Sequence, residues 1–144
     1  MRIVKDTLWT WLLPDGERDT DREEWGRHGG KWIVFDRGDE IVALGEKLRT
    51  FIDSGEVRSA KYWNGDPSAI NVYSLDSERD KTWDILRDLG AGNARVWEYD
   101  YAWCRNAMSP VEFLYSWFSK FRTILQSYGF SGTLKLIREV FLSR

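Results

Sequence analysis

Cysteine and histidine are almost absent from this chain of 144 residues, which contains one of each, Cys104 and His28. A single cysteine excludes an internal disulfide and any cysteine-based zinc site, so a reducing compartment is the default. The residues after Met1, Arg2–Asp6, lack the apolar stretch of a secretory signal. No uncharged apolar run approaches the roughly 20 residues that a membrane span needs. We therefore expect a cytoplasmic protein with no transmembrane segment.

The chain also lacks a large excess of charge of one sign. It contains 21 Lys and Arg and 23 Asp and Glu, which gives a formal net charge of −2. Nothing global therefore indicates a nucleic acid or a membrane as partner. The distribution is uneven: residues 1–108 hold 16 basic and 21 acidic side chains (net −5), and residues 109–144 hold 5 and 2 (net +3). We predict an α+β domain over 1–108 and a C-terminal helical extension over 109–144, packed on the domain or used for association.

Apolar periodicity predicts an α+β fold with a curved, mostly antiparallel sheet, helices on one face and a C-terminal helical hairpin. The polar stretch 15–30 is predicted to be a long loop. Gly129 is expected to break the C-terminal helices. The expected strands are 7–13, 31–36, 57–63, 70–75 and 94–101, and the expected helices before the hairpin are 39–54 and 77–89.

Nine tryptophans are the most informative feature of the composition. Most of them are expected to pack in the interior, and an interior position for all nine remains one of two interpretations. The other is that Trp25 and Trp103, which lie in polar or loop-like stretches, and Trp63, at a strand end, are accessible. An exposed indole on a concave sheet is a stacking platform, worth about 1–3 kcal/mol per stacked base.

Five basic side chains are candidates for binding an anion. If Lys61 points into the concavity of the sheet, it is a phosphate ligand or a base with a lowered pKa; otherwise it is a solubilising lysine. Arg95, at the start of the last strand, has the same two interpretations. Arg27, His28 and Lys31 flank a glycine pair whose backbone N–H groups could complete an anion site. The sequence contains no recognised phosphate-loop, metal or cofactor motif, and we expect neither a metal nor a cofactor.

Four segments resemble a known family in order and content: Gly30–Phe35, Ser59–Lys61, Ile70–Asp76 and Arg95–Tyr101. Together they span residues 30–101 and are similar to the basophilic-leukaemia-expressed protein family and its archaeal relatives, labelled phosphothreonine lyase-domain proteins. The resemblance implies a fold similar to that of the cap-binding translation initiation factors, a curved antiparallel sheet backed by helices.

A phosphothreonine lyase uses a lysine base, a histidine acid and further cations that hold the phosphate. By resemblance, Lys61 corresponds to the base and Lys31 to a phosphate-holding lysine. The acid histidine is expected at the position where this chain has Ile33, which leaves His28 as the substitute.

A cap-binding factor instead clamps a purine between two tryptophans, with a carboxylate at the edge of the base. By resemblance, Trp25 corresponds to one clamp ring, with Glu24 as its acidic neighbour. Trp9 or Trp11 is the candidate for the second ring.

The leading hypothesis from the sequence is a binding module for a phosphorylated, nucleotide-like small molecule or an RNA end. The alternatives are a phosphothreonine lyase-like β-elimination enzyme and an interaction or oligomerisation protein that acts through 109–144. The first helix of this extension is expected to lie across the domain core, to pair with another chain as in a homodimer, or to lie in a membrane interface. The predicted roles are catalytic for Lys61 and His28, phosphate-binding for Lys31, Arg95 and Arg27, and stacking for Trp25, Trp63 and Trp11. This hypothesis requires Lys31, Lys61 and Arg95 to meet in one hollow beside an accessible indole.

Overall fold

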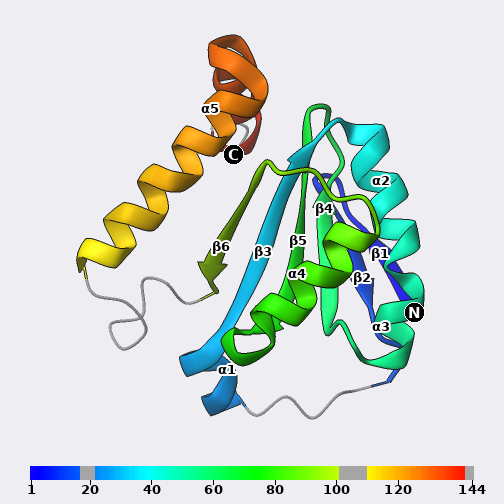
Figure 1. Cartoon of the computed structure of the whole chain (residues 1–144). Helices are drawn as coiled ribbons and strands as arrows, with labels where there is room; N and C mark the ends of the chain where they lie inside the picture. The colour runs from blue at the N-terminus through cyan, green and yellow to red at the C-terminus, as the bar shows by residue number, and fades with distance from the viewer. Residues whose placement is uncertain (17–21, 101–109, 142–144) are drawn as a thin grey trace.

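The computed structural model describes residues 1–16, 22–100 and 110–141, and its centre is a six-stranded sheet (Figure 1). Every neighbouring pair of strands is antiparallel. The predicted α+β class is therefore confirmed. The strands in spatial order are β1 (Arg2–Lys5), β2 (Trp9–Leu13), β4 (Ser59–Trp63), β5 (Ser68–Leu75), β3 (Gly29–Asp36) and β6 (Arg95–Tyr99).

Three helices cover one face of the sheet, here called the core face: α2 (Gly38–Lys47), α3 (Arg49–Ser54) and α4 (Arg79–Asp88), which follows the 3₁₀ turn η1 (Asp76–Glu78). Alternate residues of the strands point toward these helices, as the two-residue period of a strand requires. The resulting core is fully apolar and comprises Leu12, Val34, Ile41, Leu44, Leu48, Ile52, Val57, Ala60, Ile70, Val72 and Leu86.

The other face, here called the open face, carries α1 (Arg22–His28) and α5 (Pro110–Phe141). Ile124 and Tyr128 of α5 pack on Ile33, Phe35 and Val96, which alternate with the core-face residues of the same strands. The Tyr128 hydroxyl also lies within hydrogen-bonding distance of the backbone oxygens of Asp36 and Ser68. This end of α5 is therefore fixed on the sheet, beside β3 and β6.

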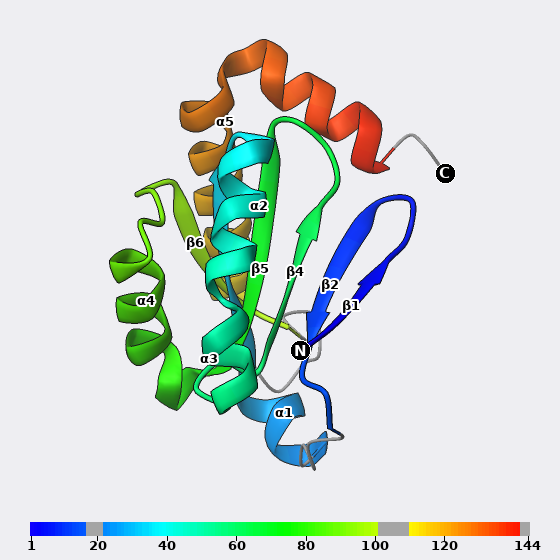
Figure 2. The same cartoon turned by 90° about the vertical axis from the view of Figure 1, so that its right-hand side faces the viewer.

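The helix α5 changes direction at Gly129, whose φ of 65° and ψ of −177° are not helical (Figures 1 and 2). A positive φ of this kind favours glycine, so the predicted break is confirmed. The division of the chain at residue 108 falls within 101–109, outside the described residues, and stays a prediction.

Three local predictions were wrong. Strand β1 was missed because its four residues are all exposed and show no buried side of a pleat. The stretch predicted as a loop contains α1, a short polar helix with no fully buried residue. The predicted helix 39–54 is two helices, α2 and α3, which meet at Leu48. Among the described residues, no helix has the length and hydropathy to cross a membrane.

Candidate functional site

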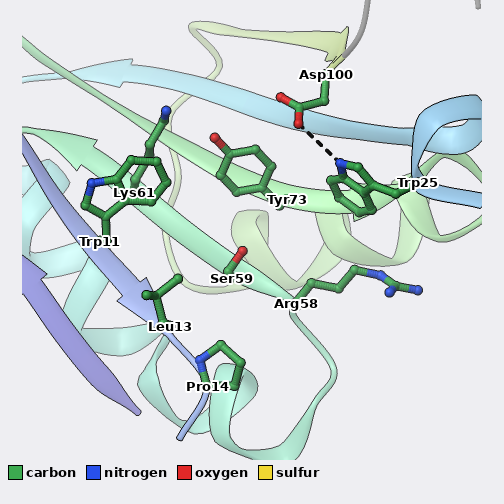
Figure 3. A pocket seen from close by; sticks show the side chains of 9 residues that line it. All are labelled: Trp11, Leu13, Pro14, Trp25, Arg58, Ser59, Lys61, Tyr73 and Asp100. Carbon is green, nitrogen blue, oxygen red and sulfur yellow. Dashed lines mark hydrogen bonds between the residues drawn. The ribbon is translucent and has the colours of Figure 1, made fainter. Parts of the chain in front are cut away.

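A pocket of about 560 Å³ opens on the open face, between α1 and strands β2 and β4 (Figure 3). The strand register explains its composition: Trp11 pairs with Lys61 and Ser59 pairs with Tyr73, so all four side chains share a face. Small-molecule pockets usually measure about 300–1,000 Å³, so this volume suits a ligand the size of a mononucleotide. The lining consists of Trp11, Leu13, Pro14, Trp25, Arg58, Ser59, Lys61, Tyr73 and Asp100.

Lys61 rises from β4 between two indole rings. Its Nζ lies 4.3 Å from the ring centroid of Trp11 and 4.7 Å from that of Trp9. Burial lowers the pKa of the Lys61 ammonium below its ordinary value, and the neighbouring Lys31 ammonium lowers it further. No carboxylate of the described chain forms an ion pair with Lys61. The carboxylates of Asp100 and Asp6 act on Lys61 only from a distance, so the pocket contains a half-buried cation whose direct neighbours include two aromatic rings.

Lys31 is in a different electrostatic situation, because Asp100 neutralises it. The Nζ of Lys31 lies 2.9 Å from Oδ1 of Asp100, and both side chains are largely shielded from solvent. The second carboxylate oxygen of Asp100 accepts a hydrogen bond of 3.2 Å from the Trp25 indole (Figure 3). One carboxylate thus fixes a lysine of β3 and a tryptophan of α1 on the same side of the pocket.

The Trp25 ring packs directly on the backbone of Gly29, at the start of β3. An added Cβ at Gly29 would lie 2.5 Å from ring atom Cδ2 of Trp25, so only glycine leaves room for the ring there. The ring lies 6.2 Å from that of Tyr73, at an angle of 50°. The Arg58 guanidinium is 5.9 Å from the Trp25 ring, and its Nε is 3.3 Å from a carboxylate oxygen of Glu78.

Tyr73 forms the back of the pocket. Burial raises the pKa of its hydroxyl well above the ordinary value, and the carboxylates of Asp100 and Glu98 raise it further. The phenol therefore stays protonated and can donate a hydrogen bond to a ligand. Sequence reasoning missed Tyr73, Arg58 and Asp100. Tyr73 pairs with Ser59 on one side and with Lys31 on the other. A prediction of this strand register would have placed Tyr73 in the site.

The structure brings together four of the residues predicted for a site: Lys61, Lys31, Trp25 and Trp11. Of these, Trp11, Trp25 and Lys61 line the pocket, and Lys31 reaches it through Asp100. Both indoles of the lining are partly exposed. Of the three cations expected in one hollow, Lys61 therefore lines the pocket beside partly exposed indoles, and Lys31 lies next to the lining, paired with Asp100.

Arg95 does not join them, and this part of the expectation was wrong. Its partner in the register is Val34, a core-face residue, so the Arg95 side chain points toward α4. The guanidinium lies 3.5 Å from the ring centroid of Trp83 and 5.6 Å from that of Trp32. Arg95 thus stacks on tryptophans on the opposite side of the sheet from Lys61.

Trp63 is also not an accessible ring. It is 7% exposed and lies against Gly65, where an added Cβ would be 2.5 Å from the indole. The turn after β4 closes over the ring, so the prediction of a stacking role for Trp63 was wrong.

His28 and Arg27 end α1 outside the pocket lining. Nδ1 of His28 lies 3.1 Å from Asp76, and Arg27 forms an ion pair with Glu23. The glycines that follow belong to β3 and not to a loop, so the predicted anion site at this glycine pair is not formed.

A metal site is not evident in the part of the chain that the structure describes, which contains no cluster of three His, Cys, Asp or Glu side chains suited to a metal ion. The chain matches no protein-family model and no curated protein sequence. The family resemblance therefore stays a prediction, and the pocket is the feature of the molecule that bears on function.

Proposed function

We propose that the pocket binds a phosphorylated ligand with a flat ring, of the size of a mononucleotide or the end of an RNA chain. The observation that carries this proposal is the position of Lys61. It is a half-buried ammonium group without a carboxylate partner among the described residues, at the side of a pocket that is open to solvent.

The electrostatics favour an anion. Lys61 has lost part of its hydration, and the Lys31 ammonium adds repulsion, so an incoming phosphate would supply the interaction that Lys61 lacks. Arg58 lies on the opposite side of the lining, where Glu78 balances part of its charge, and is a second basic side chain of the same pocket (Figure 3). A hydrogen bond to a charged group contributes about 1.5–3 kcal/mol to binding.

The aromatic lining favours a ring beside the phosphate. Trp11 and Trp25 lie on opposite sides of the pocket, and the Tyr73 ring lies between them (Figure 3). Stacking on an aromatic side chain contributes about 1–3 kcal/mol per base and tolerates any base. The same lining therefore accommodates both parts of a nucleotide.

The elimination alternative finds less support in this geometry. A lysine with a lowered pKa suits a general base. However, the described lining of the pocket contains no histidine, and the Ile33 position is packed under α5. Binding without chemistry is thus the function that the arrangement supports best.

A fluorescence titration tests the proposal. Guanosine and adenosine monophosphate should quench the intrinsic tryptophan emission, and Lys61→Met should weaken their binding about tenfold or more, because the shape stays similar while the charge is lost. The affinity for the unphosphorylated nucleosides should be similar in the wild-type protein and in Lys61→Met. Lys81→Met is the matched control, since Lys81 is exposed on α4, away from the pocket. An absence of quenching by every nucleotide, or equal losses in the two variants, would contradict the proposal.

The pH dependence gives an independent readout of Lys61. Because its pKa is lowered from the ordinary 10.5, Lys61 loses its proton at a lower pH than an exposed lysine. Anion affinity should therefore fall as the pH rises from 7.5 toward 10, a range above the second pKa of a phosphate, which is about 6. The measurement compares nucleotide dissociation constants of the wild-type protein and Lys61→Met across this range. A parallel decline in both proteins would show that another group is responsible.

A further inference from the structure

The first segment of α5, before Gly129, carries a row of exposed apolar side chains that the pocket does not use. Each is between 36% and 75% exposed, far above the exposure of a core residue. Their spacing is three, four, three and four residues, which places them in one line along the helix. The row, here called the α5 stripe, consists of Val111, Leu114, Phe118, Phe121 and Leu125.

The sheet does not cover the α5 stripe. The helix contacts the sheet through Ile124 and Tyr128, which are not members of the stripe. The start of α5 stands well away from the strands in Figure 1. The stripe therefore lies open along the described part of the chain, which is unusual for five consecutive members of an apolar row.

The spacing and the area together indicate what the stripe fits. Apolar residues spaced alternately by three and four positions form the seam along which one helix packs against another. Taking about 150–200 Å² for a large apolar side chain, the stripe exposes roughly 500 Å². Two such stripes would bury about 1,000 Å², the minimum expected of a specific protein interface.

We propose that the α5 stripe pairs with the same stripe of a second copy of this chain, in an antiparallel, two-fold symmetric helix pair centred near Phe118. A two-fold interface requires a patch that is complementary to itself, and an uncharged apolar row meets this condition. In the antiparallel arrangement Val111 lies level with Leu125 of the other copy, so the row matches over its whole length.

The charges favour this occupant over a lipid surface. Residues 110–128 contain two basic side chains, Lys120 and Arg122. The antiparallel arrangement places the two copies of Arg122 on opposite sides of its centre near Phe118, so their like charges are separated. An anionic membrane would meet a chain whose residues 1–108 carry a net charge of −5. An interfacial helix is usually rich in basic residues, and residues 110–128 contain only these two.

The test measures molar mass by light scattering of the full chain over a range of concentrations. The wild-type protein should have the mass of a dimer, and Phe118→Lys should have that of a monomer, with at least a hundredfold weaker association. Phe130→Lys is the matched control, because Phe130 is about as exposed as Phe118 but follows the break at Gly129. This control should remain dimeric. Circular dichroism of both variants checks that the fold is retained.

The arrangement is tested by cross-linking in a Cys104→Ser background. A cysteine at position 118 should form an intermolecular disulfide readily, and so should the mixed pair Val111→Cys with Leu125→Cys. A monomeric wild-type protein, or a dimer that survives Phe118→Lys, would overturn the proposal. If the wild-type protein is a monomer that sediments with phosphatidylserine vesicles, and Phe118→Lys does not, the stripe binds a membrane and the dimer proposal is wrong. None of these outcomes depends on nucleotide binding.

Discussion

Replacing Gly29 by alanine should weaken binding of a mononucleotide about 5- to 150-fold, the range that corresponds to the loss of one stacking ring worth about 1–3 kcal/mol. The new methyl group would lie 2.5 Å from the Trp25 ring and equally close to the Trp25 backbone oxygen. The ring must therefore leave its place over β3. Its hydrogen bond to Asp100 would be lost at the same time.

The measurement is a titration of Gly29→Ala with adenosine monophosphate, followed by calorimetry so that the readout does not depend on the displaced tryptophan. Gly26→Ala is the control, because Gly26 follows Trp25 in α1 and nothing lies within 4 Å of an added Cβ there. The control should bind as the wild-type protein does. Unchanged affinity in Gly29→Ala would mean that Trp25 is not part of the binding site.

Replacing Leu48 by alanine should lower the free energy of unfolding by about 2–5 kcal/mol, the usual cost of deleting a buried leucine side chain. Leu48 is fully buried where α2 meets α3, within the cluster on the core face of the sheet. Alanine is a good helix former, so the backbone of this junction should tolerate the change. The loss therefore reports packing between the helices and the sheet.

Urea denaturation followed by circular dichroism measures this difference. The control is Val42→Ala, since Val42 is an exposed residue of α2 and its truncation should change the stability by less than about 0.5 kcal/mol. A similar midpoint for the wild-type protein and Leu48→Ala would show that this cluster is not the main source of stability.

Much of the sheet was predictable because its interior strands carry a clear signal. The strands β3, β4 and β5 contain several β-branched or aromatic residues and are bounded by glycine, asparagine and proline. Strand β1 has the same residue types over only four positions, and both of its faces are exposed. An element without a buried side leaves no periodicity to detect. The polar α1 was missed for the same reason.

The candidate site was predictable only in part, because a sequence shows which residues share a strand face but not which face is covered. Lys61 and Trp11 were found through alternation and resemblance, and their proximity is confirmed by the pairing of β2 with β4. Arg95 was misplaced because the face of β6 depends on its register with β3. Asp100 was missed because it follows β6, and only the folded sheet brings it next to Lys31.

The outermost position of β1 has a consequence for solubility. Within the described part of the chain this strand pairs with β2 alone, so its other side is an edge to which a strand of another molecule could add. Arg2 and Lys5 lie at its two ends and, because side chains alternate, on opposite faces of the sheet. Any strand that approached this edge would have to bury a positive charge on either side. We therefore expect these two basic residues to disfavour edge-to-edge association of the protein.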